Sequence, residues 1–266
     1  MIEKSLQKKY KKEIYSKFIK AIKDYKLIKE NDKVAVCVSG GKDSFLLAKC
    51  MEVYQKYYNF EVKYILMDPG YSKLHLKKIK DNAKKLNIKL DIFKTDIFKI
   101  IKDKKSPCYF CAKMRRGYLY NYAKQLGCNK IALGHHFDDV IETVFLNMFY
   151  NGTFGGMPPI LKSKNFENME LIRPLYYVKE ENIIKFNKSN DLEFIDCACV
   201  ITKKSDSKRK YIKDLIKELK TYNENIDINI FRSLENINFN TTNDFIKNSK
   251  SGIINMPIDD TNHKSD

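Results

Sequence analysis

Six consecutive residues, Ser39-Gly40-Gly41-Lys42-Asp43-Ser44, combine the backbone and the side chains that a phosphate group needs. The two adjacent glycines let the backbone bend and approach a ligand closely, so that its N–H groups can face phosphate oxygens. Ser39 and Ser44 add hydroxyl donors and Lys42 adds a cation, while Asp43 can cap a following helix or help to hold Mg²⁺. We therefore predict that this loop binds the pyrophosphate part of ATP.

Two better-known phosphate loops do not fit this segment. A Walker A loop requires Ser or Thr directly after its lysine, but Asp43 follows Lys42, and Val36 occupies the place of the first glycine. The dinucleotide fingerprint G-x-G-x-x-G is absent as well. The remaining alternative is an ordinary Gly-Gly turn, which the setting between an apolar run and a helical pattern disfavours.

Four of the seven cysteines form two close pairs. Cys108 and Cys111 make a C-x-x-C pair that Pro107 is expected to hold in an extended approach, and Cys197 and Cys199 follow downstream. Such thiols can form a redox couple, a zinc site or an iron–sulfur site, and their spacing leaves zinc and iron–sulfur open. We expect structural roles for the other three, Cys37, Cys50 and Cys128.

Two histidines and two aspartates occur together between Gly134 and Asp139. Asp138 and Asp139 can complement a helix N-terminus, or they can bind Mg²⁺ or a nucleotide. His135 or His136 can serve as a general base or orient a substrate. The residues predicted to act in catalysis are Asp43, His135, Asp138 and Asp139, and Gly134 and Asp68 are predicted to join the phosphate loop in nucleotide binding.

Alternating strands and helices must position these residues. Short apolar runs predict strands at 33–38, 62–67, 89–95, 130–133 and 171–173, and helical patterns fall at 43–58, 72–86, 112–126, 138–150 and 179–189. This alternation predicts a doubly wound α/β domain with a parallel five-stranded sheet. Ligands of such sheets bind at the carboxyl ends of the strands, which is where the phosphate loop and the His–Asp segment fall.

Helical additions flank this domain at both ends. Residues 1–30 are expected to form a basic helix, 31–200 the nucleotide-binding domain and 201–245 a helical region with helices near 207–220 and 224–237. The polar tail 246–266 is expected to be disordered.

Composition limits the class of protein. The chain has 266 residues, 43% of them hydrophobic, and a formal net charge of +17. Without a long apolar stretch or a signal-peptide core, it is expected in the cytoplasm and not in a membrane. The positive charge suits a polyanion such as RNA, although a lysine-rich genome explains it equally well. Arg115 and Arg116, with nearby tyrosines, suit an RNA loop or a solvated helix face.

Together, these motifs resemble the tRNA 2-thiocytidine synthetase (TtcA) family of the PP-loop superfamily over residues 28 to 235. The matching segments are SGGKDS at 39–44, CYFCAKMRRGYLY at 108–120, LGHHFDDVIET at 133–143, NMFYNG at 147–152, GGMPP at 155–159 and IRPL at 172–175. The first motif marks the whole superfamily, and the others are more specific.

The resemblance implies a fold, a reaction and partners. The fold would be the PP-loop, adenine nucleotide alpha hydrolase-like fold, and ATP would adenylate the C2 oxygen of a cytidine in a tRNA anticodon loop before sulfur replaces it. Cys108, Cys111 and Cys197, with Cys199 as the alternative third ligand, would hold a 4Fe–4S cluster. A sulfur donor system such as a cysteine desulfurase would supply sulfur, and a homodimer remains open.

Two alternative functions are also open. One is a zinc-containing PP-loop enzyme that adenylates another nucleoside or a small molecule. The other is a module that binds RNA or a nucleotide without chemistry.

Overall fold

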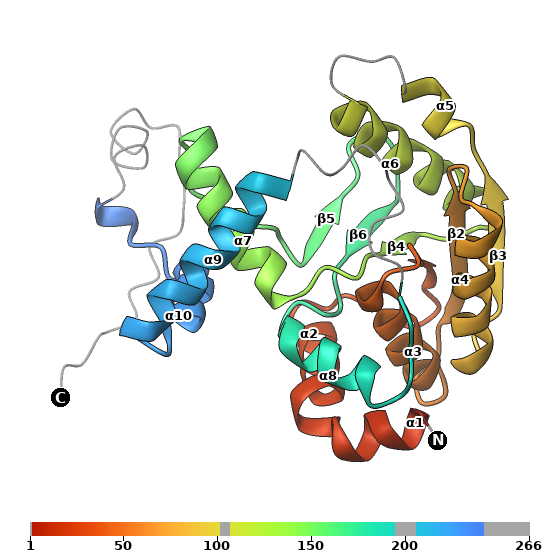
Figure 1. Cartoon of the computed structure of the whole chain (residues 1–266), viewed down its shortest axis with the longest axis horizontal. Coiled ribbons are helices and arrows are strands. Elements are labelled where there is room, and N and C mark those ends of the chain that lie inside the picture. The colour runs from red at the N-terminus through yellow and green to blue at the C-terminus, as the bar shows by residue number, and fades with distance from the viewer. Residues whose placement is uncertain (1, 102–106, 195–205, 242–266) are drawn as a thin grey trace.

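A six-stranded sheet in the order β3-β2-β1-β4-β6-β5 forms the centre of the computed structural model, which describes residues 2–101, 107–194 and 206–241 (Figure 1). Five strands are parallel, as predicted, and β5 at the edge runs antiparallel to β6. The strands are β1 (Lys33–Cys37), β2 (Glu61–Asp68), β3 (Leu90–Lys94), β4 (Lys130–Ala132), β5 (Ile160–Lys162) and β6 (Glu170–Ile172).

Both faces of the sheet are covered, as the apolar runs of the strands require. Val34 and Val36 of β1 pack into a large core on one face, and Ala35 and Cys37 pack into a smaller core on the other. Alternate side chains of a strand point to opposite faces, so this short strand contributes to both cores. The larger core contains residues of the N-terminal helices, α3, α4 and α8, and the smaller core contains residues of α6.

Helices connect the strands and extend the domain at both ends. In chain order they are α1 (Ile2–Lys4), η1 (Ser5–Lys9), η2 (Lys11–Tyr15), α2 (Ser16–Asp24), α3 (Lys42–Gln55), α4 (Lys73–Lys85), α5 (Ile97–Ile101), α6 (Pro107–Gln125), α7 (Phe137–Leu146), η3 (Asn147–Asn151), α8 (Glu180–Lys188), α9 (Asp206–Tyr222), α10 (Ile226–Ser233) and η5 (Phe239–Thr241). The N-terminal segment was predicted as one regular helix, but η1 and η2 are π-helical.

The expected extended approach to Cys108 falls on residues before Pro107, and residues 102–106 lie outside the described part of the chain. Helix α6 begins at Pro107, so Cys108 and Cys111 both belong to its first turns. Proline is favoured at the first position of a helix, because its missing N–H has no partner there and its φ already suits a helix. The proline therefore starts the helix that carries the C-x-x-C pair.

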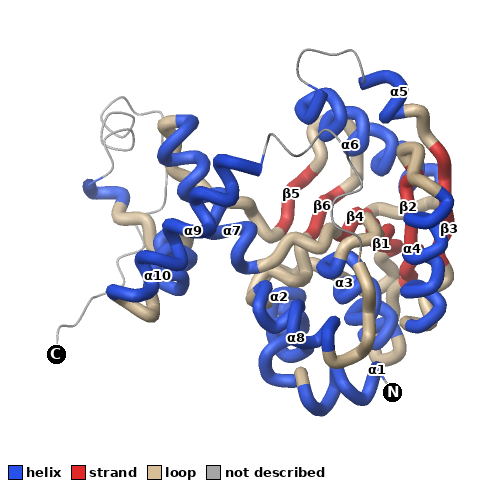
Figure 2. The backbone as a smooth tube through the Cα atoms, in the orientation of Figure 1, coloured by secondary structure: helices blue, strands red, loops and turns tan. Residues whose placement is uncertain are grey.

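The C-terminal helices α9 and α10 pack against α7 on the side of the molecule beyond β5 (Figure 2). The ring of Phe231 on α10 stacks on Phe137 of α7 with centroids 4.8 Å apart. This contact fixes the C-terminal helical region against the helix that begins with the His–Asp segment. In the parts of the chain that the structure describes, no helix is both long and apolar enough to cross a membrane. The predicted tail 246–266 lies outside the described residues.

Candidate active site

The phosphate loop lies where the connections of the sheet change direction. The chain proceeds from β1 to β2 and β3 on one side and continues with β4 and β6 on the other. Loops that leave two neighbouring strands at such a point separate and form a crevice, which is the usual ligand site of an open α/β sheet. The phosphate loop leaves β1 and the His–Asp segment leaves β4, so the fold brings the two predicted motifs together.

Ser44 shapes the phosphate loop from inside. Its hydroxyl donates to the Gly41 carbonyl oxygen (2.9 Å) and accepts from the Ser39 backbone N–H (3.1 Å). Gly40 has a φ of +89°, a conformation that side chains with a Cβ rarely adopt. These contacts hold the loop in a fixed curve before α3 begins at Lys42.

Gly134 is in direct contact with this loop. A Cβ atom at Gly134 would lie 2.9 Å from both the carbonyl carbon of Asp43 and the backbone nitrogen of Ser44. Only a glycine lets the exit of β4 pass so close to the first turn of α3. Gly134 therefore sets the distance between the two motifs, and its role in nucleotide binding stays a prediction.

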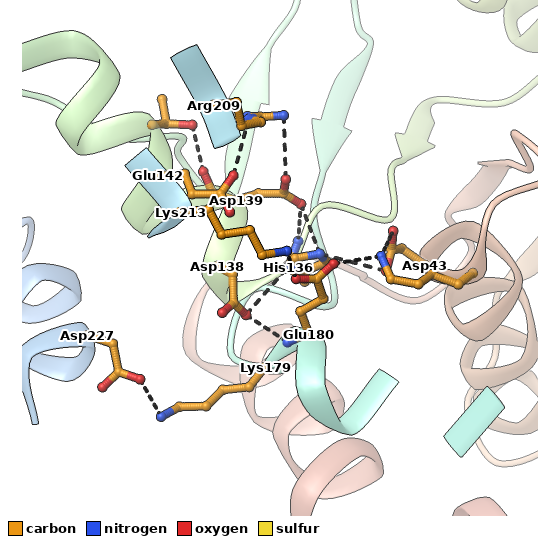
Figure 3. A network of polar contacts seen from close by, with 12 residues as sticks. Asp43, His136, Asp138, Asp139, Glu142, Lys179, Glu180, Arg209, Lys213 and Asp227 are labelled. Atoms are coloured by element: carbon orange, nitrogen blue, oxygen red, sulfur yellow. Dashed lines mark hydrogen bonds and ion pairs between the residues drawn. The ribbon is translucent and has the colours of Figure 1, made fainter. Parts of the chain in front are cut away.

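His136 lies at the centre of three carboxylates (Figure 3). Its Nε2 is 3.5 Å from Asp139 Oδ2 and 3.7 Å from Asp43 Oδ1, and its Nδ1 is 3.6 Å from Asp138 Oδ2. Burial alone would lower the pKa of His136, but the three negative charges outweigh burial and raise it. The three carboxylates therefore favour the protonated form of His136, which links the aspartates of the two motifs.

Asp43 and His135 each carry a buried atom that lacks a hydrogen bond within the described part of the chain. Asp43 Oδ1 and His135 Nδ1 form no hydrogen bond with any residue that the structure describes. Burial, together with the charge of Asp139, raises the pKa of Asp43, while burial lowers the pKa of His135 to about 4. His135 is therefore neutral at pH 7, and Asp43 Oδ1 is held by the charges of Lys42 (3.1 Å) and His136 (3.7 Å) without a hydrogen bond from a described residue.

The predicted catalytic residue Asp138 contacts helix α8, unlike the neighbouring Asp139, which lines the cavity. Its carboxylate accepts a hydrogen bond from the backbone N–H of Glu180 (2.7 Å), the first residue of α8. Burial would raise the pKa of Asp138, but His136 and this hydrogen bond lower it. Asp138 thus connects α7 to α8, which makes it a positioning group for His136.

Cations from the C-terminal helix α9 complete the network. Arg209 Nε is 3.2 Å from Glu142 Oε2, and Arg209 Nη1 is 3.7 Å from Asp139 Oδ1. Lys213 pairs with Glu180, whose carboxylate also lies 3.0 Å from the Lys42 ammonium. Residues that are far apart in sequence therefore hold the lysine of the phosphate loop and the aspartates of the His–Asp segment.

Burial raises the pKa of Glu142 to about 7, and the charge of Asp139 adds to this effect. Sequence reasoning missed Glu142, Glu180, Arg209 and Lys213 as site residues. No local pattern distinguishes them from solvated helix residues.

A cavity of about 290 Å³ opens between these motifs. Its wall includes Ser39, Asp43, Ser44, Gly134, His135 and Asp139 from the predicted motifs, together with Cys37, Val38, Met67, Tyr71, Arg115, Leu119 and Leu133. Polar phosphate-binding groups thus face an apolar wall from β2 and α6. This combination suits the phosphates and the flat ring of a nucleotide.

Asp68 lies beside this cavity, because Met67 and Tyr71 on either side of it in the sequence both line the cavity wall. Its Oδ1 accepts hydrogen bonds from the backbone N–H groups of Gly70 (2.9 Å) and Tyr71 (2.7 Å). The carboxylate therefore shapes the turn that places Tyr71 in the wall. Direct nucleotide binding by Asp68 stays a prediction.

The predicted metal ligands are described only in part. Cys111 is half-buried and packs in a small apolar cluster with Met67 and Leu119, both of which line the cavity. The side chain of Cys108, and Cys197 and Cys199 altogether, lie outside the described residues. Cys37, Cys50 and Cys128 are buried, as expected for structural residues, and burial raises their pKa values.

The fold and the site define a nucleotide-binding α/β protein with a phosphate loop at the end of β1. Residues 6–219 match the PP-loop domain family, which covers most of the chain. A solved structure with the same fold is the U34-tRNA thiolase NcsA from Methanococcus maripaludis with its [4Fe-4S] cluster. It has a TM-score of 0.67 and 23% identity, and the match covers 83% of this chain and 76% of that one.

Curated relatives identify the family within the PP-loop proteins more closely. The tRNA-cytidine(32) 2-sulfurtransferase of Geotalea uraniireducens is 38% identical over 82% of this chain and 88% of its own length. The enzymes of the same name from Geobacter metallireducens and Alcanivorax borkumensis are each 38% identical over 87% of this chain, covering 91% and 82% of their own lengths. The chain belongs to the tRNA-cytidine(32) 2-sulfurtransferase family within the PP-loop proteins, which confirms the family resemblance.

Proposed function

We propose that this protein is an ATP-dependent tRNA sulfurtransferase that replaces the C2 oxygen of an anticodon-loop cytidine with sulfur. One observation carries the proposal. The phosphate loop, the His135–Asp139 segment and helix α6 with Cys111 surround one cavity. Family membership supports tRNA as the substrate. The cavity would bring the residues for adenylation close to the helix that carries Cys111, which would serve the sulfur transfer.

Adenylation of the cytidine would come first. The C2 oxygen attacks the α-phosphorus of ATP, a new O–P bond forms, and the bond to pyrophosphate breaks. The phosphate loop, with Lys42 at the start of α3, would stabilise the charge of the departing pyrophosphate. The carbonyl oxygen of the base becomes a good leaving group only after this step, because it then departs with AMP.

Magnesium fits the carboxylates at this site. Asp43 Oδ1 is buried without a hydrogen-bond partner among the described residues, and Asp139 shares His136 with it. Carboxylate oxygens and phosphate oxygens together are the ligands that Mg²⁺ prefers. We assign Asp43 and Asp139 to the metal, and neutral His135 to orientation of the base.

The second step replaces AMP with sulfur. A sulfur nucleophile attacks C2, AMP leaves with the original oxygen, and 2-thiocytidine results. A 4Fe–4S cluster, when bound by Cys108, Cys111 and Cys197, or by Cys199 as the alternative third ligand, would supply the sulfide. The position of Cys111 fits this role, since its cluster partners Met67 and Leu119 form the cavity wall. The apolar wall would exclude water, which would otherwise hydrolyse the adenylated base.

Mass spectrometry of tRNA nucleosides tests the substrate. Cells that lack the gene should lose 2-thiocytidine, and the wild-type gene should restore it while a Cys111→Ser variant should not. Iron and acid-labile sulfide, measured on protein purified without oxygen, test the cluster. Unchanged 2-thiocytidine rejects the substrate, and a colourless preparation with stoichiometric zinc rejects the cluster.

A further inference from the structure

A group of exposed apolar side chains lies beyond the end of α7, away from the catalytic cavity. We call Phe149, Tyr150 and Phe154 the aromatic platform. Their exposed fractions are 50%, 43% and 52%, and the neighbouring Met148 is 46% exposed. Aromatic rings are usually buried, so a contiguous exposed group indicates a binding surface.

Hydrogen bonds and a left-handed glycine fix the turn that carries the aromatic platform. The Asn147 side-chain amide donates to the Gly155 carbonyl oxygen (2.7 Å), and the Thr153 N–H donates to the Asn147 carbonyl oxygen (3.1 Å). Gly152 provides the left-handed residue at the end of η3, with a φ of 61°. The turn thus holds its rings outward at little further entropic cost when a ligand binds.

Contacts at the base of the aromatic platform also fix its rings. Phe149 packs edge-on against Phe145 of α7 with centroids 5.2 Å apart. The Lys208 ammonium of α9 lies 4.3 Å from the centroid of the Tyr150 ring. A cation is therefore built into the aromatic surface, and the next residue on α9, Arg209, belongs to the catalytic network.

The cation beside Tyr150 indicates what occupies this surface. Lysine is depleted from the cores of protein–protein interfaces, so Lys208 disfavours a second copy of the chain. Aromatic rings beside a cation are the arrangement that binds unpaired nucleic-acid bases, whose flat faces stack while their phosphates meet positive charge. The net charge of +17 agrees with such a polyanion.

The distance between the aromatic platform and the catalytic cavity suits neighbouring nucleotides of one RNA loop. Asp139 and Phe149 are ten residues apart along α7 and η3, which corresponds to about 15 Å at the helical rise per residue. A nucleotide that is flipped into the cavity leaves its neighbours in the loop without stacking partners. Rings at this distance can replace the lost stacking.

We propose that the aromatic platform stacks unpaired anticodon-loop bases that neighbour the target nucleotide. This inference rests on the proposed function, because it assumes that tRNA is the substrate. It identifies Phe149, Tyr150 and Phe154 as positioning residues that hold the RNA, while the cavity residues carry out the reaction.

Binding of an anticodon stem-loop and of a fully paired duplex with the same stem tests the proposal. Fluorescence anisotropy should show that Phe149→Ala weakens stem-loop binding about 5- to 150-fold, the range for one lost base–aromatic contact, and that the double variant with Phe154→Ala binds more weakly still. Duplex binding should not change, because paired bases offer no free face. Phe149→Trp should retain affinity and Phe149→Leu should lose it, since stacking and not apolar contact is required.

Two controls are matched to this design. Tyr57 and Tyr222, with exposed fractions of 71% and 83%, are more exposed than the platform rings, and Tyr57→Ala and Tyr222→Ala should leave binding unchanged. The slope of log affinity against log salt should stay constant in the aromatic variants and fall by about 0.7 in Lys208→Gln.

Equal affinities of the double variant and the wild type for the stem-loop would overturn the proposal, even where 2-thiocytidine is formed. A wild-type dimer that Phe149→Ala dissociates, without a change in stem-loop affinity, would instead make this surface a protein interface. If the stem-loop binds through these rings but no 2-thiocytidine is formed, the proposed function fails and the aromatic platform stands.

Discussion

Substitution of Gly134 by alanine tests how the two catalytic motifs depend on each other. The new Cβ would lie 2.9 Å from backbone atoms of Asp43 and Ser44, whereas ordinary contact begins near 3.4 Å, so the first turn of α3 must retreat by about 0.5 Å. Backbone atoms cannot rotate away as a side chain can. Overpacking of this kind typically costs about 1–3 kcal/mol of folding stability.

The effect on ATP binding should exceed the effect on folding. The displaced turn carries Asp43 and Ser44, and a misplacement of about 1 Å at a reacting centre can cost about 100-fold in rate. We expect the dissociation constant for ATP with Mg²⁺, measured by titration calorimetry, to rise about 10- to 100-fold. The free energy of unfolding in urea should fall by no more than about 3 kcal/mol.

Gly117 provides the matched control for this substitution. It lies inside α6, and a Cβ there would meet no heavy atom within 4 Å. Gly117→Ala should raise the free energy of unfolding by about 1 kcal/mol, because alanine favours a helix, and should leave ATP affinity unchanged. Wild-type ATP affinity in a folded Gly134→Ala variant would refute the argument that this glycine sets the spacing of the site.

Three further substitutions test the electrostatics. Asp43→Asn should raise the free energy of unfolding, because burial raises the pKa of Asp43 and so disfavours its charged form, yet it should abolish Mg²⁺-dependent formation of 2-thiocytidine. A variant that loses both stability and 2-thiocytidine formation would contradict this expectation. The pKa of Glu142 is about 7 in the folded protein against 4.5 normally, so its contribution to stability is present below pH 4.5 and is lost as pH rises through 7. Glu142→Gln should flatten the pH dependence of urea unfolding across that interval. Glu180→Gln should tighten ATP binding about 2- to 5-fold in calorimetry, because Glu180 competes with phosphate for Lys42, and weaker binding would indicate that Glu180 instead orients the lysine.

The parallel strands and the phosphate loop could be predicted because their signals are local. A buried parallel strand reads as a short apolar run, and a Gly-Gly pair directly after it indicates a sharp turn whose backbone can approach a ligand. Strand β5 has no such signal, because Leu161 and Lys162 are exposed and the strand has no buried apolar run. Helix α5, with five residues, is too short for its periodicity to be recognised.

The ion pairs of the site could not be predicted in the same way. Arg209 meets Glu142 only because α9 packs on α7, and that packing depends on surfaces rather than on spacing. Glu180 resembles any acidic residue that begins a helix, a position that favours carboxylates by itself. The partner of a charged residue is a property of the folded chain, so Lys42 could be assigned to phosphate from its motif but not to Glu180.

These pairs explain how a site for a polyanion tolerates so many carboxylates. Five acidic residues belong to the network at this site, namely Asp43, Asp138, Asp139, Glu142 and Glu180. Four basic residues pair with them: Lys42, His136, Arg209 and Lys213. Triphosphate alone would meet repulsion from the aspartates. Under the proposed function, ATP that brings Mg²⁺ would supply a positive charge to Asp43 and Asp139, and its phosphates would then take Lys42 from Glu180. We infer that the carboxylates select the magnesium complex of ATP, because only that form exchanges the resident ion pairs for new ones without leaving a buried charge unpaired.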